Sequence, residues 1–285
     1  MSLQFDRQYR FSAGRAGATG FEVGETTVAR PTALHISFNI DKADTETPNT
    51  GKISLWNLNP EHIAVLKTND CIVTLRAGYG TQMPLIFAGT VTYAETALDN
   101  SDVQTTIEAV DGRVALRDSY ISLSYSGKVN TKKVIEDIAA AMGVTLTFSY
   151  NAKFTDLPNG FPFVGPARVA LDKACASSGL KWQMQNGVLQ VLMRNDTMSR
   201  NVYVLSPDSG LIGIPKHIVY GKDGGNDDGQ SGWEVDYLLN GVIGINDFVR
   251  LESKYAKGYF RVRSVGLNGD NLEGDWTSTA KLVEA

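Results

Sequence analysis

Hydrophobic and polar residues alternate with a period of two along the first ~115 residues. In TALHISFNID, one side carries Leu34, Ile36, Phe38 and Ile40, and the other carries His35, Ser37, Asn39 and Asp41. Such alternation is typical of a strand with one buried and one solvated face. Further strands are predicted for GKISLWNL, DCIVTLRAGY, LIFAGTVTYAETAL and DVQTTIEAVDG, which Gly-rich or Asn/Asp-rich turns separate.

One short helix is predicted between these strands. Asn59 can cap it, Pro60 suits its first position, and Glu61 favours its dipole, so PEHIAVL should form about two turns. We expect this helix to close one end of a small antiparallel barrel.

The pattern changes to a mixture of helices and strands between Ile121 and about Arg194. NTKKVIEDIAAAMG has apolar residues at helical spacing, with Asn130 as the cap and Gly143 as the stop. VTLTFSY is predicted as a strand and GPARVALDKACASSG as a second helix. LKWQMQNGVLQVLM should be a hairpin, because Asn-Gly suits a two-residue turn. A small α/β domain is therefore predicted between two β regions.

The chain returns to strands after about Ser199, in KHIVYGK, WEVDYLL, DFVRLESKY, GYFRVRSVGL and WTSTAKLVEA. Several of these segments resemble earlier ones in the same order. The segment GWEVDYLLNGVIGIND shares with GKISLWNLN and the Asn-Asp that follows it the order Gly, an aromatic residue, Leu-Asn and Asn-Asp. The segment NDFVRLESKY resembles NDCIVTLRAGY if one residue is skipped, and DWTSTAKLV resembles DVQTTIEAV. This order favours an internal duplication of a β-barrel unit, although unrelated antiparallel hairpins can share such patterns.

The predicted architecture is mainly β with an α+β insertion. Two tube-like barrel domains, residues 1–117 and 199–285, flank an inserted domain of helix, strand, helix and hairpin at residues 118–198. If the barrels are duplicates, Trp56 and Tyr237 should occupy equivalent places. Leu58 and Leu239 should also match, each pointing into its own core.

Composition and charge exclude several classes of protein. Hydrophobic residues make up 42% and charged residues 20%, which fits an ordinary folded protein. The net charge of −4 argues against nucleic acid or an anionic membrane as the main partner. The N-terminus lacks a signal-peptide pattern and no apolar run reaches membrane length, so we expect folding in the cytoplasm. Cys71 and Cys175 are too few for a disulfide framework or a zinc site and are expected to be buried apolar side chains.

No constellation of catalytic, metal-binding or cofactor-binding residues can be assigned. His35, His62 and His217 have no second ligand nearby in sequence, and structural or solvated roles are favoured. GQSG, from Gly229 to Gly232, resembles a serine-protease nucleophile loop without the rest of that pattern. The loop DGGNDDGQSGWE could offer oxygen donors to calcium from Asp223, Asp227 and Glu234. However, Gly225 has no donor side chain and Asp228 stands where an EF-hand has Gly, so a solvated loop is favoured.

The segments together resemble the baseplate hub proteins of contractile-tail bacteriophages. The resemblance is carried by the NLN strand with its short helix, AGY, IFAG.V and EA.DG in the first region. The helix V...IA..MG, the run A..SGL.W....G.L.V and the final LLN..I...D.V.L.S....G.FRV..V...GD...GDW.T continue it. It covers most of the chain in the right order, and its motifs are structural rather than chemical.

The resemblance implies a structural virion protein of the tail baseplate, assembled in the host cytoplasm, without catalytic residues, cofactors or metals. A homotrimer would form a ring of six similar barrels that binds the hexameric tail tube, or a tube-initiator protein, on one side and the trimeric spike on the other. A tape-measure protein is a further possible partner. DNA would pass through a wide, mostly polar lumen without specific binding, and no membrane anchor is expected. We also expect the loops KADTETPNT and KDGGNDDGQSG to make equivalent contacts between ring neighbours.

Two other classes of function stay open at this point. A tail-associated peptidoglycan hydrolase would need a paired acid and nucleophile, and no spacing singles one out. A carbohydrate-binding adhesion module would need a surface cluster of exposed aromatic side chains.

Overall fold

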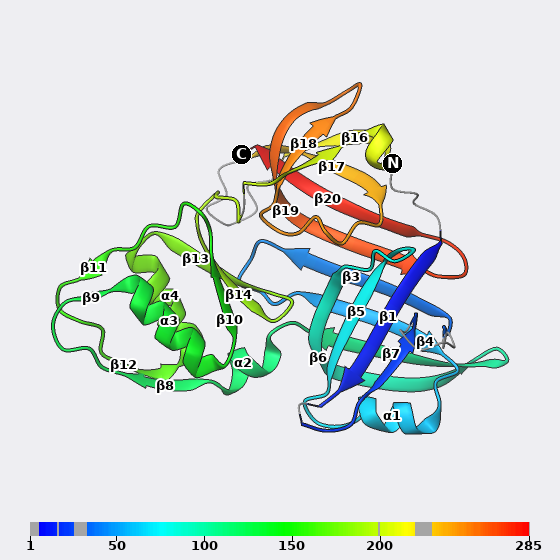
Figure 1. Ribbon diagram of the computed structural model, residues 1–285, viewed down its shortest axis with the longest axis horizontal. Coiled ribbons are helices and arrows are strands. Elements are labelled where there is room, and N and C mark those ends of the chain that lie inside the picture. Colours follow the sequence, from blue (N-terminus) through cyan, green and yellow to red (C-terminus); the bar gives the residue numbers. More distant parts are fainter. Residues whose placement is uncertain (1–5, 16, 26–32, 199, 220–229, 285) are drawn as a thin grey trace.

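The computed structural model describes residues 6–15, 17–25, 33–198, 200–219 and 230–284. Within them, strands from both ends of the chain form one 13-stranded sheet. Figure 1 shows the C-terminal strands above the N-terminal strands, with the middle of the chain to one side. The mainly β fold with an α+β insertion, predicted from the sequence, is confirmed.

The N-terminal strands follow the predicted alternation. They are β1 (Arg7–Gly14), β2 (Phe21–Gly24), β3 (Ile36–Ala43), β4 (Thr50–Trp56), β5 (Ile72–Tyr79), β6 (Leu85–Asp99) and β7 (Asp102–Val110). Their spatial order is β3-β4-β7-β6-β5-β1-β2, and every neighbouring pair is antiparallel. Ile36, Phe38 and Ile40 are buried and Asn39 and Asp41 exposed, which confirms the two predicted faces of β3.

The C-terminal strands are β15 (Val202–Leu205), β16 (Leu211–Val219), β17 (Ser231–Leu238), β18 (Phe248–Glu252), β19 (Lys257–Asp270) and β20 (Trp276–Glu284), with a 3₁₀ turn, η1, at Pro207–Ser209. Their order is β16-β17-β20-β19-β18-β15. These pairs are antiparallel except β15 with β18, which is parallel. Closure of either half into a complete barrel stays a prediction.

Helix α1 (Pro60–Leu66) lies against β1 and β6, below the N-terminal strands in Figure 1. The side chain of Asn59 accepts a hydrogen bond from the His62 backbone N–H at 2.7 Å, as the capping pattern predicts. Both halves contribute to one hydrophobic core. Within it, the rings of Phe38 and Trp276 lie 5.3 Å apart, and the Trp276 indole donates to the carbonyl of Gly78.

The insertion has its own core, which packs helices α3 (Thr131–Met142) and α4 (Ala167–Ser177) against a three-stranded sheet. That sheet consists of β10 (Thr145–Phe148), β13 (Leu180–Gln185) and β14 (Val188–Met193). Two further pairs of strands are β8 (Tyr120–Leu123) with β12 (Phe163–Pro166), and β9 (Val129–Asn130) with β11 (Asp156–Leu157). A short helix, α2 (Arg113–Asp118), leads into it. Asn186 and Gly187 both have positive φ, which confirms the predicted two-residue turn.

Candidate functional site

Strands β3 and β19 join the two β regions into a single sheet. They pair antiparallel from Ala43 opposite Ser264 to Ser37 opposite Asp270. On the polar face, the Asn39 side chain donates to that of Asn268 at 2.6 Å. At the end of the pairing, the backbone N–H of Asp44 donates to the carbonyl of Arg263 at 2.8 Å. We call this pairing the internal seam.

A buried ionic network lies at one end of the internal seam. Asp44 accepts hydrogen bonds from Arg261 of the second β region and from Lys181 of the insertion, the latter at 2.6 Å. The side chains of Asp44 and Arg261 are only 5% and 2% exposed. Burial lowers the pKa of Lys181, and the negative charge of Asp44 opposes that change. One carboxylate therefore links all three parts of the chain.

One face of the joined sheet is mostly polar. A single row of directly paired residues crosses it, namely Thr277, Asn268, Asn39, Lys52, Glu108 and Tyr93. From β16 across to the distal part of β6, the acidic residues on this face include Asp41, Glu95, Asp99, Asp102, Glu108, Glu234, Asp236 and Asp270, and the basic ones include Lys52, Lys216 and Lys281. Acidic residues outnumber basic ones, so this face is unsuited to holding a nucleic acid tightly.

The two halves repeat one strand order. The order β3-β4-β7-β6-β5 corresponds, strand for strand, to β16-β17-β20-β19-β18. The next strand differs in direction, because β1 is antiparallel to β5 and β15 is parallel to β18. The pairing register shifts by one residue at Thr92 of β6 opposite β7 and at Arg263 of β19 opposite β20. The N–H of Val91 donates to the carbonyl of Cys71, as that of Val262 does to Asp247. Shared order and shared bulges support the predicted duplication.

The register shows that one predicted equivalence is wrong. Leu55 pairs with Thr105, and Tyr237 pairs with Ser278, so Leu55 is the counterpart of Tyr237. Trp56 lies on the other face, where it stacks on His35 with ring centroids 3.8 Å apart. The sequence matching was out of step by one residue, and in a strand one residue reverses the face.

The leucines predicted to point into the cores do so. Leu58 and Leu239 are 6% and 2% exposed, and both belong to the joined core. Their hydrogen-bonding positions differ, however. The backbone N–H of Asn57 donates to the carbonyl of Val103, and that of Leu239 donates to the carbonyl of Trp276. Asn57 is therefore the counterpart of Leu239, and Leu58 lies one residue further along its loop.

Besides β2, which pairs only with β1, and β15, which pairs only with β18, two strand edges of the large sheet lack a partner among the described residues. Strand β5 pairs with β6 only as far as Thr90, so the distal part of β6, Tyr93–Asp99, has β7 on one side alone. Strand β16 likewise has only β17. Apolar side chains are exposed on both edges, and Leu98 of β6 and Ile214 of β16 are 81% and 59% exposed.

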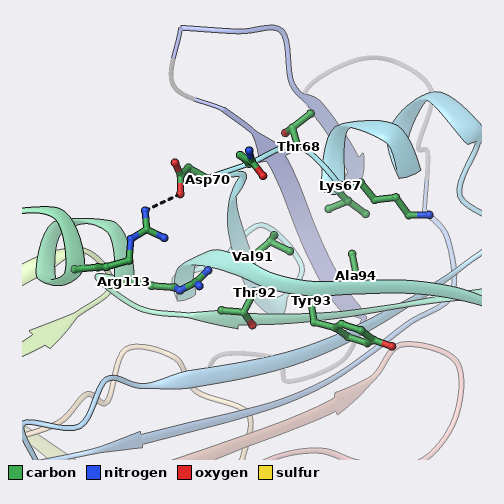
Figure 2. A pocket seen from close by; sticks show the side chains of 11 residues that line it. Lys67, Thr68, Asp70, Val91, Thr92, Tyr93, Ala94 and Arg113 are labelled. Carbon is green, nitrogen blue, oxygen red and sulfur yellow. Dashed lines mark hydrogen bonds and ion pairs between the residues drawn. The ribbon is translucent and has the colours of Figure 1, made fainter.

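A groove begins beside the open edge of β6. Figure 2 shows it between the end of α1, the Val91–Ala94 segment and Arg113. Arg117 forms an ion pair with Asp70 at 3.2 Å across its rim. In the second half, the corresponding place beside Val262 is filled by Asp44, which contacts Asn246 and Arg261.

The three histidines lie in three separate places. Nε2 of His35 is 2.9 Å from an Asp270 carboxylate oxygen. His62 stacks on Phe21, and partial burial lowers its pKa. His217 contacts the Ser231 hydroxyl at 2.7 Å. Cys71 and Cys175 are both buried free thiols, and burial raises the pKa of each.

The loop predictions have mixed outcomes. KADTETPNT contacts its own chain at both ends, because Lys42 donates to the Asn186 side chain and Asn49 to the carbonyl of Met184. Thr45, Glu46, Thr47 and Thr50 are exposed, and the ring contact expected of this loop stays a prediction. Most of KDGGNDDGQSG lies outside the described residues, including Asp223, Gly225, Asp227, Asp228 and Gly229. Glu234, the third candidate calcium ligand, lies on β17, 3.3 Å from the Lys216 ammonium.

Neither a metal centre nor a membrane span is evident in the described part of the chain. Its His, Cys, Asp and Glu side chains form no cluster suited to holding a metal ion. None of its helices has the length and apolar character to cross a bilayer.

The fold is similar to that of solved phage tail proteins. The fold matches the 43 kDa tail protein of prophage MuSo2 from Shewanella oneidensis, with a TM-score of 0.64, 9% identity, and coverage of 98% of this chain and 97% of that one. It also matches the tail protein from Neisseria meningitidis MC58, with a TM-score of 0.60, 9% identity, and coverage of 97% and 96%.

A third similar structure is the E. coli c3393 protein, a component of the type VI secretion system with structural similarity to the T4 tail proteins gp27 and gp5. Its TM-score is 0.60 at 9% identity, with coverage of 88% of this chain and 74% of that one. A search of curated proteins finds no match.

The family model for baseplate hub gp41 matches residues 19–255. The chain therefore belongs to the baseplate hub gp41 family and is a structural component of the phage tail baseplate. The resemblance inferred from the sequence motifs is confirmed.

Proposed function

We propose that this chain forms a ring of three copies that adapts the hexameric tail tube to the trimeric spike. The repeated strand order carries the proposal, because three chains with two similar halves each would present six similar sheets. A protein with threefold symmetry could then contact a sixfold partner through equivalent surfaces. In this proposal residues 1–117 and 199–285 act as the repeated units, and residues 118–198 as an outward insertion.

The polar face of the sheet would line the lumen of the ring. Its mixed charges, with an acidic excess, allow DNA or a tape-measure protein to pass without strong adhesion. The proposed role is structural and needs no catalytic residue. A tail-associated hydrolase would need a catalytic site, and a carbohydrate-binding module would need a cluster of exposed aromatic side chains. The adapter role requires neither.

The mass of the complex formed with the spike protein tests this proposal. Native mass spectrometry should show three copies of this chain bound to each spike trimer, and a complex with a single copy of this chain on each spike trimer would refute it. Incubating the pure chain with peptidoglycan should release no muropeptides. Release that a single substitution abolishes would favour the hydrolase, and saturable binding to a glycan would favour the adhesion module.

A further inference from the structure

Strands β15, β18 and β19 carry exposed apolar side chains on the face turned away from the hydrophobic core. The pairing register places Val204, Arg250 and Tyr259 in one row across the three strands. In the next row Val202 lies opposite Phe248, whose ring stacks on that of Tyr259 with centroids 5.5 Å apart. Val202, Val204 and Tyr259 are 41%, 39% and 53% exposed. We call these five residues the outer patch.

Basic side chains adjoin the outer patch where β18 turns into β19. Lys254 lies in this turn, with its ammonium 5.7 Å from the ring centroid of Tyr255, which is 58% exposed. Lys257 begins β19 and lies opposite Glu252. This part of the surface therefore sets Arg250, Lys254 and Lys257 against Glu252, although the whole chain has a net charge of −4. Its charge favours a negatively charged partner.

Arg250 is only partly satisfied within the chain. Its Nη2 forms an ion pair with Glu252 at 2.8 Å. Its Nε is buried and has no hydrogen-bond partner among the described residues. The side chain as a whole is 42% exposed, so the outer part of the guanidinium can bind a second carboxylate from outside the chain.

The corresponding place in the first half has different chemistry. The shared bulges set the correspondence, and the counterparts of Val204, Arg250 and Tyr259 are Ser12, Thr74 and Ala88. The hydroxyls of Ser12 and Thr74 are hydrogen-bonded to each other at 2.6 Å. This row is small and satisfies its own polar groups, whereas the row in the second half is large, apolar and charged. The outer patch is therefore a property of the second half and occurs once in each chain.

We propose that the outer patch binds an acidic segment of another protein of the particle, one segment for each chain. Apolar side chains of the segment would cover Val202 and Phe248, and a carboxylate would bind Arg250. Further acidic residues would lie beside the lysines of the turn. Phe248 and Glu252 are about 13 Å apart along β18, so about four extended residues or nine helical ones would reach from the apolar end to the basic end.

The combination of apolar and basic groups favours a protein segment over a nucleic acid. A nucleic acid would pair with the basic side chains but would leave Val202 and Val204 without apolar cover. The binding itself needs a single chain. Only the expectation of three such sites in one ring rests on the proposed function.

Site-specific photocrosslinking in assembled tails identifies the occupant. Tyr259→p-benzoylphenylalanine should crosslink to one segment of another virion protein, and mass spectrometry should show that this segment contains both acidic and apolar residues. The matched control position is Arg76, which is exposed on the outer face of the first half at the counterpart of Glu252. Arg76→p-benzoylphenylalanine should not crosslink to that segment.

A labelled synthetic peptide with the sequence of the crosslinked segment then tests the chemistry on the full chain. Fluorescence anisotropy should show one peptide bound to each chain, with an affinity that falls as the salt concentration rises. Arg250→Thr, which introduces the residue of the first half, should weaken binding about tenfold or more, because a charge-assisted hydrogen bond is lost. Lys257→Glu should also weaken it. Tyr120→Ala is the control, since Tyr120 is 70% exposed outside the outer patch and should leave binding unchanged.

The outcomes separate this inference from the proposed function. A crosslink from position 259 to an acidic, apolar segment of another protein, with weaker peptide binding in Arg250→Thr, supports the inference. A crosslink to a second copy of this chain, no crosslink, two peptides for each chain, or full binding by Arg250→Thr overturns it. A ring of another size with one peptide for each chain refutes the threefold ring and supports the outer patch. A threefold ring without the crosslink refutes the outer patch alone.

Discussion

Replacing Asp44 with Ala should destabilise the protein strongly, because it leaves a buried guanidinium without its anion. The Arg261 side chain is 2% exposed, so water cannot replace the lost carboxylate. Removing one partner of a buried ion pair costs about 3–5 kcal/mol. The lower end applies here, because Arg261 keeps its contact with the Asn246 side chain, and Lys181, 25% exposed, can reach solvent.

Urea unfolding measures this loss directly. The Asp44→Ala variant should lose about 3 kcal/mol of unfolding free energy, seen as a lower midpoint at an unchanged slope. Asp41→Ala is the matched control, because Asp41 is exposed on β3, three residues before Asp44, and should change stability by about 0.5 kcal/mol or less.

A double-mutant cycle isolates the ionic interaction. Adding Arg261→Met to Asp44→Ala removes the stranded charge, so the double variant should recover much of the loss. If Asp44→Ala costs no more than Asp41→Ala, or if the two substitutions add without coupling, the network does not hold the three parts together as argued.

Three further predictions concern other buried groups. Leu58→Ala and Leu239→Ala should each cost about 2–5 kcal/mol in urea unfolding, and a loss below about 1 kcal/mol would contradict their placement in the core. Burial raises the pKa of Asp247 to about 6, so ionisation of this carboxyl group lowers the free energy of unfolding as the pH rises from about 4 to 6. Asp247→Asn should therefore stabilise the protein by about 1–3 kcal/mol at pH 8 and have little effect at pH 4, and a pH-independent difference would refute this. Asp111 accepts the backbone N–H groups of the 186–187 turn, so Asp111→Ala should speed hydrogen exchange at Gly187 while leaving exchange in β1 unchanged.

Local patterns predict most of the regular elements. The cap at Asn59, the helix stop at Gly143 and the Asn186–Gly187 turn each depend on residues next to one another, and all three lie where the sequence places them. Strand alternation likewise identifies β3 to β7. Strands β1 and β2 were missed, because only Tyr9, Phe11 and Ala13 carry the alternation in β1 and β2 has just four residues.

The assembly features depend on contacts between distant residues. Asp44 and Arg261 are separated by more than 200 positions, and nothing local marks either as one half of a buried pair. The equivalence of Trp56 and Tyr237 failed because letters were matched without knowledge of the pairing register. The open edges of β6 and β16 become visible only when every other strand has been given its neighbours.

The internal seam has a consequence for how a ring would be built. Because β3 and β19 belong to one polypeptide, their joining is unimolecular and does not depend on protein concentration. In a ring assembled from such chains, half of the joints would be complete as soon as each chain has folded. Only the other half would require encounters between molecules. Three chains would form the ring in two association steps, where six separate units would need five, so less translational freedom is lost. Fusion of the two halves in one gene would also let the joint within a chain and the joint between chains evolve separately. The first could evolve for stability and the second for control of when the ring assembles.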